Sequence, residues 1–180
     1  MEVYLVRHTE TITPKGVCYG QSDVALNEPY QLLFDQIVAQ LPSTFGRIYS
    51  SPLQRCSILA DHINVQSGKR LSIVQDDRLK ELDFGSWELQ AWDSIPMSEL
   101  QPWMDDFVNI SVPDGESMLD LHIRVGHYIS SLKKSQANDR SVIVTHAGVI
   151  RSFYAHAQRF DLKDLFTIDV PFGSVHALNL

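Results

Sequence analysis

Two of the seven histidines in this chain follow directly on short apolar runs. Residues 3–6 lead into Arg7 and His8, and residues 142–145 lead into His146. An imidazole in such a place is a candidate nucleophile, general acid or base, or metal ligand. An arginine beside it offers a planar fork of donors that suits an oxyanion. Because burying a histidine without a role is costly, His8 and His146 are the first candidates for chemistry.

A second arginine occupies a place where a purely structural role is unfavourable. Ser51 and Pro52 are expected to begin a helix, which puts Arg55 in the first turn of that helix. A cation there opposes the helix dipole, whereas a bound anion makes the same position favourable. Two imidazoles and two guanidiniums together suit a phosphoryl group, whose equatorial oxygens accept paired hydrogen bonds.

Other kinds of site find less support in the sequence. A zinc site needs a third ligand, and neither histidine has an HxH or HxxxH spacing around it. The sequence contains no GxSxG elbow of a serine hydrolase and no glycine-rich nucleotide loop. The remaining histidines are expected to be surface or core groups without a chemical role: His62, His122, His127, His156 and His176.

Short apolar runs alternate with helical patterns along the whole chain. Strands are expected at residues 3–6, 47–50, 71–74, 141–145 and 175–180. Helices are expected over about residues 27–41, 51–67, 117–132 and 148–157. This alternation predicts an α/β fold, a single-domain three-layer α/β/α sandwich with a mostly parallel sheet. Because such sheets bind ligands at the carboxyl ends of their strands, His8 and His146 are expected to face one pocket.

The first of these helices is expected to begin near Asn27, an N-cap residue type, and to end before Pro42. Its buried stripe would consist of Leu33, Ile37 and Leu41, which share one face at helical spacing.

Residues 89–116 are the least regular part of the chain and are rich in Trp, Pro and Asp. We expect a lid-like excursion there, with a short helix or two, covering the carboxyl edge of the sheet. Trp87, just before it, is expected to pack in the core. Ser117 and Asp120 then form a capping-box pattern that starts the next helix. No repeat and no linker divides residues 1–180, so we expect a single domain.

Composition narrows the class of protein. The chain has 180 residues and a formal net charge of -7, which disfavours a general nucleic-acid binder. Only two cysteines occur, Cys18 and Cys56, in no metal-binding or disulfide-framework spacing. No apolar stretch approaches a membrane span, and no signal peptide precedes the first strand. We therefore expect a cytoplasmic protein with no membrane partner, and a homodimer as the default assembly.

Five motifs occur in order: residues 5–9 (LVRHT), 51–56 (SPLQRC), 81–88 (ELDFGSWE), 113–117 (PDGES) and 145–148 (THAG). Over nearly the whole chain they resemble the motifs of the histidine phosphatase, or phosphoglycerate mutase-like, superfamily. The resemblance implies a phosphoglycerate mutase-like fold and a small-molecule phosphomonoester as substrate. It implies no cofactor and no metal.

The resemblance also implies a catalytic set in this chain, consisting of His8, Glu81, Arg7, Arg55 and His146. In the implied reaction, His8 attacks phosphorus and becomes a phosphohistidine. Glu81 first protonates the leaving oxygen and then activates the water that clears the intermediate. The two arginines and His146 hold the equatorial oxygens. Asp83 and Glu88 lie near Glu81 in sequence and remain alternatives to it.

Within the superfamily, residues 16–24 (GVCYGQSDV) most resemble bacterial α-ribazole phosphatases, which act on α-ribazole 5'-phosphate or cobalamin 5'-phosphate in cobalamin biosynthesis. The resemblance implies that Tyr19, Gly20, Gln21 and Ala147 contact the substrate. A broad phosphatase, a phosphoglycerate mutase-type enzyme and a catalytically silent phospho-ligand binding protein remain alternatives.

Three positions depart from the family pattern. Thr9 and Leu89 replace glycines, and Pro14 replaces an asparagine that many members carry. The sequence does not decide whether three aromatic residues line the substrate entrance or pack in the core: Trp92, Trp103 and Phe107. Cys18 is expected to fill a small space in the core rather than to act as a redox switch.

Overall fold

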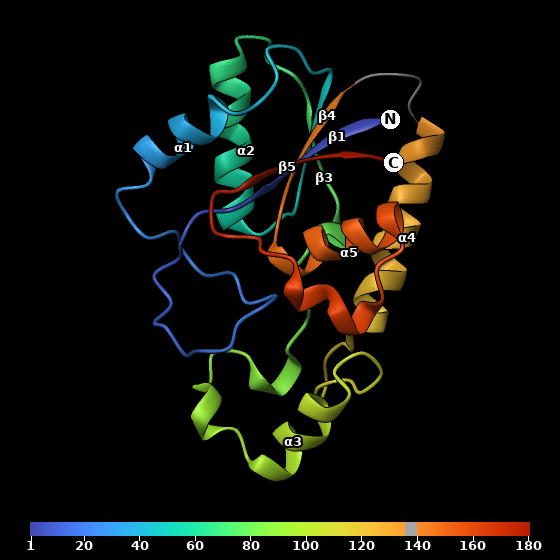
Figure 1. The fold of residues 1–180 in the computed structure, drawn as a ribbon. Coiled ribbons are helices and arrows are strands. Elements are labelled where there is room, and N and C mark those ends of the chain that lie inside the picture. Colours follow the sequence, from blue (N-terminus) through green and yellow to red (C-terminus); the bar gives the residue numbers. More distant parts are fainter. Residues whose placement is uncertain (136–139) are drawn as a thin grey trace.

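The computed structural model describes residues 1–135 and 140–180, which form a five-stranded sheet in the order β3-β2-β4-β1-β5. Its strands are β1 (Glu2–Arg7), β2 (Arg47–Ser50), β3 (Ile73–Gln75), β4 (Ser141–Thr145) and β5 (Val175–Asn179). Only the pairing of β5 with β1 is antiparallel; the other three pairings are parallel. The predicted mostly parallel α/β fold is confirmed (Figure 1).

The centre of the sheet explains why the two histidines meet. All five residues of β4 are buried, and β1 pairs with β4 so that Arg7 lies opposite Thr145. The next residue of each chain segment is a histidine, and the backbone N–H of His8 donates to the carbonyl of Thr145. Since a strand buried on both faces tolerates no slip in register, this pairing sets His8 and His146 side by side.

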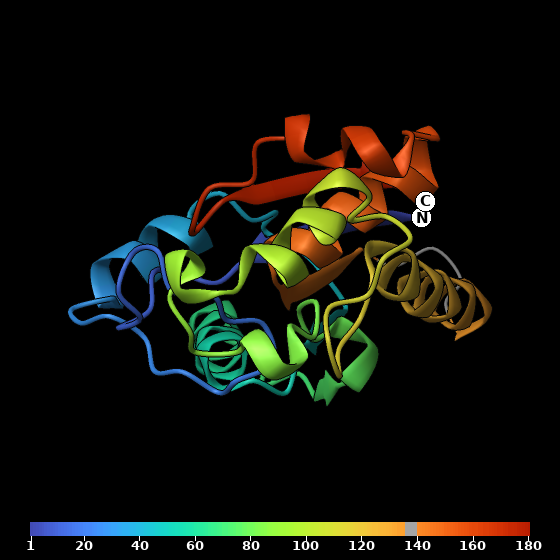
Figure 2. The same ribbon diagram turned by 90° about the horizontal axis from the view of Figure 1, so that it is seen from below.

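Helices cover both faces of the sheet, as Figures 1 and 2 show. The helices are α1 (Gln31–Val38), α2 (Gln54–Ser67), α3 (Met97–Asp105), α4 (Met118–Ser135) and α5 (Ala147–Gln158). On one face, α1 and α2 pack against Val6 and its neighbours. On the other face, α4 and α5 pack against Leu5 and its neighbours. Successive residues of β1 therefore contribute to opposite core layers, which produces the three-layer sandwich.

The start of α4 agrees with the predicted capping box. The backbone N–H of Asp120 donates to the Ser117 hydroxyl, and the Asp120 carboxylate accepts from the backbone N–H of Ser117. The helical stripe predicted after it is buried: Leu121, Val125, Tyr128, Ile129 and Leu132. No helix within residues 1–135 and 140–180 combines the length and the apolar composition needed to cross a membrane.

The observed α1 is shorter than predicted, and of the predicted stripe Ile37 is buried and Leu41 packs against the core, but Leu33 does not. The helix begins at Gln31, and Phe34 and Ile37 face the core, whereas Leu33 is 45% exposed. Asn27 does not cap it: the N-cap position is Tyr30, and the backbone N–H of Asn27 donates to the carbonyl of Glu10, which ties this segment to the loop after β1. A neighbouring loop thus determines where the helix starts.

The starts of α2 and β3 also differ from the prediction. Ser51 does not cap α2; its backbone N–H donates to the carbonyl of Val144 and continues the β2 ladder, so the helix starts only at Gln54. Leu71 lies outside β3, because the side chain of Asn64 accepts from its N–H and donates to its carbonyl. In both places a tertiary hydrogen bond replaces the local pattern.

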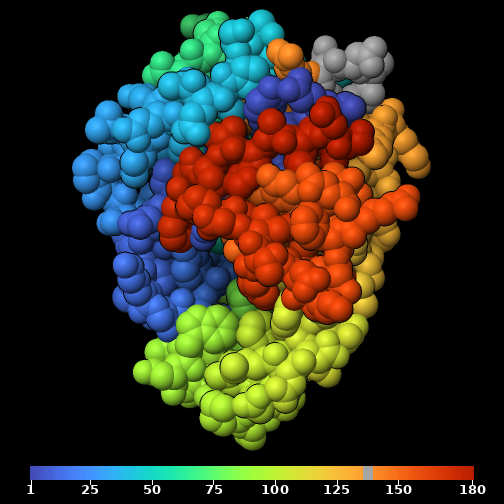
Figure 3. Space-filling view, in the orientation of Figure 1, coloured from blue at the N-terminus to red at the C-terminus, as the bar shows by residue number. Residues whose placement is uncertain are grey.

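Between β3 and α4 the chain forms three short 3-10 turns and α3 at the carboxyl end of the sheet, below it in Figure 1. The short helix predicted in this segment is α3, and Figure 3 shows residues of the segment as the lower part of the surface. That the segment acts as a lid stays a prediction. Trp87 is 1% exposed and packs with Ile95 and Val112, as predicted. The segment therefore has a small core of its own.

Candidate active site

His8 stands at the end of β1 with its ring 3% exposed. Its Nδ1 lies 2.7 Å from the carbonyl oxygen of Thr9. A carbonyl only accepts, so Nδ1 carries the hydrogen and the lone pair of the neutral ring is on Nε2. Burial, together with the charges of Arg55 and Arg7, holds the pKa of His8 well below its usual value of 6.5. The imidazole is therefore neutral at pH 7, the form that a nucleophile requires.

His146 follows β4 and lies beside His8, with 5.1 Å between the ring centroids. It is fully buried, and its Nε2 lies 2.9 Å from the Ser51 hydroxyl. Burial, and then the neighbouring His8 and Arg55, hold the pKa of His146 well below 6.5. The structure thus brings the two predicted histidines together, but only His8 lies on the cavity wall. The prediction that both face one pocket was wrong, because His146 is fully buried behind His8.

Arg7 is the first of two arginines beside His8. Its guanidinium donates to the carbonyl of Val170, and its Cζ lies 3.7 Å from the ring centroid of Phe172. The Nε of Arg7 is buried and has no acceptor in the described part of the chain. An unpaired buried donor is costly, so this guanidinium retains capacity for an oxyanion.

Arg55 is fully buried in the first turn of α2. Its guanidinium donates to the carbonyls of Ser22, at 2.8 Å, and Gly20. Like the Nε of Arg7, that of Arg55 has no acceptor among the described residues, and neither arginine forms an ion pair there. Two positive charges without carboxylate partners make this corner a favourable place for an anion.

Glu81 lies across the same cavity. Both of its carboxylate oxygens are 3.1 Å from the backbone N–H of Gly148, in the first turn of α5, and one accepts from Leu82 at 3.0 Å. A Cβ at Gly148 would lie 2.3 Å from this carboxylate, so only glycine permits the approach. Arg124 donates to the backbone carbonyl of Glu81 at 2.8 Å and fixes the segment from behind.

The two alternative carboxylates point elsewhere. Asp83 accepts from the backbone N–H of Gly85, and Glu88 accepts from backbone N–H groups of residues 20–22. Of the three neighbouring acids, only Glu81 lines the cavity.

The cavity holds about 260 Å³ and is lined by two chemically different sets of side chains, which we call its polar end and its aromatic end. The two sets meet where Phe172 lies against Arg7 and Tyr19 lies near Arg55. The polar end is formed by Arg7, His8, Arg55 and Glu81. The aromatic end is formed by Val17, Cys18, Tyr19, Phe84, Trp92 and Phe172. A small oxyanion with an apolar, flat appendage matches this division.

Of the four residues predicted to contact the substrate, only one lies on the cavity wall. Tyr19 lines the cavity, and the Cζ of Arg55 lies 5.4 Å from its ring centroid. Gly20, Gln21 and Ala147 are not on the cavity wall; Gly20 and Gln21 direct their N–H groups at Glu88. Ala147 is buried at the start of α5 beside His146.

Sequence analysis missed Phe84 and Phe172 and left Trp92 unassigned. Phe172 reaches the site from the loop before β5, far from every motif, and only a Pro-Phe-Gly turn at residues 171–173 marked the position. The aromatic motif at residues 81–88 contained the signal for Phe84.

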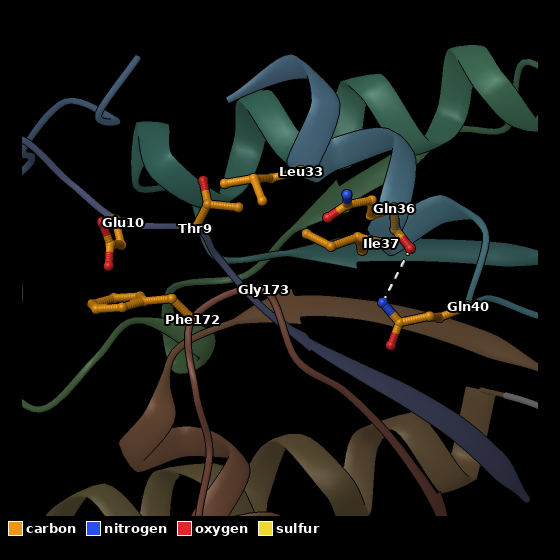
Figure 4. A pocket seen from close by; sticks show the side chains of 8 residues that line it. All are labelled: Thr9, Glu10, Leu33, Gln36, Ile37, Gln40, Phe172 and Gly173. Carbon is orange, nitrogen blue, oxygen red and sulfur yellow. Dashed lines mark hydrogen bonds between the residues drawn. The ribbon is translucent and has the colours of Figure 1, made fainter. Parts of the chain in front are cut away.

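A second cavity of about 260 Å³ lies on the other side of Phe172, between α1 and the turn at Gly173 (Figure 4). Its wall is Thr9, Glu10, Leu33, Gln36, Ile37, Gln40, Phe172 and Gly173. This wall includes no arginine, lysine or histidine, so it offers no cation to a phosphate. Phe172 lines both cavities.

Within residues 1–135 and 140–180, no group of three or more His, Cys, Asp or Glu side chains is arranged so that it could hold a metal ion. The cations in the site are those of the two arginines.

Comparison with known proteins agrees with the site. The sequence profile described as "Histidine phosphatase superfamily (branch 1)" matches residues 3–180. The chain belongs to the histidine phosphatase superfamily. It is therefore an enzyme of phosphoryl chemistry, a phosphatase or a mutase, and the resemblance drawn from the five motifs is confirmed.

Relatives within the superfamily carry different names. A probable phosphoglycerate mutase of Yersinia pestis is 33% identical over 173 residues, covering 88% of this chain and 79% of the relative. Phosphoserine phosphatase 1 of Hydrogenobacter thermophilus is 24% identical, covering 100% and 87%. The crystal structure of the α-ribazole phosphatase from Shigella flexneri has the same fold, with a TM-score of 0.90, 22% identity, and coverage of 100% and 91%.

Proposed function

We propose that this protein is a metal-independent phosphomonoesterase that works through a phosphohistidine at His8. The observation that carries the proposal is a neutral, buried imidazole on the wall of a cavity that also presents a carboxyl group and two guanidiniums, each with a buried Nε that lacks an acceptor in the described residues. Binding a phosphate alone would need the arginines but neither a nucleophile nor an acid. This argues against a catalytically silent binding protein.

The reaction proceeds in two displacements. In the first, Nε2 of His8 attacks phosphorus, the P–O bond to the leaving group breaks, and Glu81 in its acid form donates a proton to the departing oxygen. In the second, the Glu81 carboxylate takes a proton from water, the water oxygen attacks phosphorus, and the P–N bond breaks. Arg7 and Arg55 offset the charge on the equatorial oxygens in both steps.

His146 serves the reaction from the interior in this proposal. Its ring packs edge-on against His8, and its hydrogen bond to Ser51 fixes its orientation. A neutral ring there adds no positive charge that would lower the basicity of His8, and it keeps the nucleophile in one rotamer.

The aromatic end supports α-ribazole 5'-phosphate, or cobalamin 5'-phosphate, as the substrate. The leaving group of the former carries a flat benzimidazole, which stacks favourably on aromatic side chains such as Phe84, Trp92 and Phe172. Phosphoserine and phosphoglycerate carry a carboxylate instead. The cavity wall has no cation for it besides Arg7 and Arg55, which face the phosphate in this proposal. The motif at residues 16–24 favours the same substrate.

The test is phosphate release in the presence of a metal chelator, from α-ribazole 5'-phosphate, 3-phosphoglycerate and an aryl phosphate, with wild type and His8→Ala. Preference for the ribazole compound that is lost in the variant would support the proposal. Conversion of 3-phosphoglycerate to its 2-isomer without net release would favour the mutase reading, to which the Yersinia pestis relative points. Binding without His8-dependent turnover of any compound would overturn the proposal. Acid-labile phosphate retained on wild type during turnover would support the intermediate.

A further inference from the structure

Glu88 is a half-buried acid whose carboxylate accepts hydrogen bonds from several backbone N–H groups of one loop, residues 20–22. One oxygen accepts from the backbone N–H groups of Gly20, Gln21 and Phe84, at 3.0, 2.8 and 3.1 Å. The other accepts from Gly20 and Ser22, at 3.0 and 3.1 Å. Four peptide groups thus converge on one side chain, and hydrogen bonds to an ionised acceptor are stronger than those between neutral groups.

The opposite edge of the same loop faces Arg55. The carbonyls of Gly20 and Ser22 accept from the two terminal nitrogens of its guanidinium. These are the hydrogen bonds found for Arg55 in the described residues, and none of them is donated to a carboxylate. The orientation of Arg55 therefore depends on where residues 20–22 hold their carbonyl oxygens.

We propose that Glu88 is a positioning residue for Arg55, acting through the peptide groups of residues 20–22. The N–H side of this loop is bound by the carboxylate and the C=O side by the guanidinium, so the loop connects an acid outside the cavity to a cation inside it. The inference rests on the proposed function in one respect, that Arg55 holds the transferring phosphoryl group.

Close packing of Gly20 against Leu82 and the negative charge of Glu88 hold the loop of residues 20–22 in this arrangement. A Cβ at Gly20 would lie 1.8 Å from the carbonyl oxygen of Leu82, so the loop runs against the Glu81–Glu88 segment without room for a side chain. Burial raises the pKa of Glu88, but the N–H donors of the loop outweigh it and hold that pKa below its usual value. The acid is therefore ionised at neutral pH, and each N–H bond is charge-assisted.

A second anchor keeps the loop attached if Glu88 is changed. Cys18 donates its N–H to the carbonyl of Gln90 and accepts from the N–H of Leu89. The substitution Glu88→Gln is therefore expected to shift residues 20–22 rather than unfold the segment. The amide presents an NH₂ group where the carboxylate has an acceptor, and this group repels the peptide N–H that it faces.

The test is a double-mutant cycle with Glu88→Gln and Arg55→Ala, read as kcat on an aryl phosphate. In the wild-type background, Glu88→Gln is expected to lower kcat about 10²-fold, because a catalytic group displaced by about 1 Å has an effect of that size. In the Arg55→Ala background, the same substitution is expected to change kcat less than about 3-fold, the non-additivity typical of residues acting as a unit. Equal losses in both backgrounds would overturn the inference.

Glu99→Gln is the matched control, because Glu99 accepts from the indole of Trp87 in the same segment and, in the described part of the chain, forms no hydrogen bond with residues 20–22. It should leave kcat unchanged. If Glu88→Gln does not fold, Glu88→Asp takes its place in the cycle. Aspartate keeps the negative charge, but its side chain is too short to reach the same peptide groups. The decrease in kcat that Glu88→Asp causes must likewise disappear in the Arg55→Ala background.

Failure of the proposed function has a separate signature. If wild type turned over no phosphomonoester, the same cycle would be read as the affinity for inorganic phosphate by calorimetry. Weakening by Glu88→Gln only when Arg55 is present would support the inference without the phosphatase. Additive weakening would overturn it.

Discussion

The two ends of the cavity are built in different ways. At the polar end, Arg7 and His8 continue a buried strand and Arg55 lies in the first turn of a helix packed on the sheet. At the aromatic end, Tyr19, Phe84 and Phe172 come from segments between the strands and long helices. Glu81 stands at the boundary, in an irregular segment but bound to the first turn of α5.

Under the proposed function, this difference separates the residues of the reaction from those that select the leaving group. Strand register and helix packing are set by burial on both faces of the sheet, so the polar end varies little without loss of the fold. Loops tolerate substitution and insertion, so the leaving-group end is free to change. One fold can thereby keep a phosphoryl reaction and exchange its substrates.

The sharpest test of the polar end is His8→Ala. We expect kcat to fall about 10⁴-fold or more on every phosphomonoester, because without Nε2 no covalent intermediate forms. Phosphate release under saturating substrate is the measurement. The exposed His127→Ala is the control and should retain full activity. Residual activity within 10-fold of wild type would remove His8 from the reaction.

Glu81→Gln probes the boundary between the two ends. We expect kcat for α-ribazole 5'-phosphate to fall about 10²- to 10⁴-fold, the usual contribution of a general acid. The loss should be much smaller for a nitrophenyl phosphate, whose leaving group departs without a proton. Asp83→Asn, which alters a carboxylate away from the cavity wall, is the control. Equal losses on both substrates would contradict the acid role.

The burial of His8 and His146 predicts that the stability of the fold depends on pH. Burial lowers the pKa of folded His8 and His146 well below 6.5, so between the folded and unfolded values the unfolded chain binds more protons. The free energy of unfolding should therefore be constant from pH 8 to about 6.5. It should decrease below that by up to about 1.4 kcal/mol per pH unit for each histidine. Urea midpoints measure it. The decrease should shrink in His8→Asn and more in the double Asn variant; an unchanged decrease would contradict the assignment.

Trp92→Leu tests the aromatic end. We expect kcat/KM for α-ribazole 5'-phosphate to fall about 10-fold through lost stacking, and to change little for glycerol phosphate, which has no ring to stack. Trp103→Leu is the matched control, since Trp103 packs beside Trp92 but is not on the cavity wall. A parallel loss on both substrates would show that Trp92 supports the fold rather than selectivity.

The smallest expected effect concerns Leu89, which stands where the family often carries glycine. Its φ is 64°, in the left-handed region, and its side chain is 57% exposed. We expect Leu89→Gly to raise the free energy of unfolding by up to about 1 kcal/mol, because glycine adopts this conformation without strain. Chemical denaturation measures it, and Leu89→Ala, which retains a Cβ, should give no such gain. Activity should not change.

Sequence patterns predicted the regular elements best where burial is complete. The predicted bounds of residues 47–50 and 141–145 coincide with β2 and β4, whose side chains are mostly or wholly buried. The prediction was least accurate for α1, which buries Ile37 as predicted but Phe34 in place of Leu33. It begins at Gln31, after a segment that the hydrogen bond from Asn27 to Glu10 ties to the loop after β1. Contacts between segments overrode local propensity there.

The sequence by itself determined the α/β class, the family, and the convergence of His8 with His146. Apolar strands buried on both faces admit one register, and the residues after them must then meet at one edge. Only the tertiary structure decided that Glu81 rather than Asp83 or Glu88 lines the cavity, and that both histidines are neutral. It alone placed Phe172 over Arg7, 165 positions earlier in the chain (172 minus 7). Burial, side-chain direction and contacts between distant loops arise from packing of the whole chain, and no local pattern of residue types encodes them.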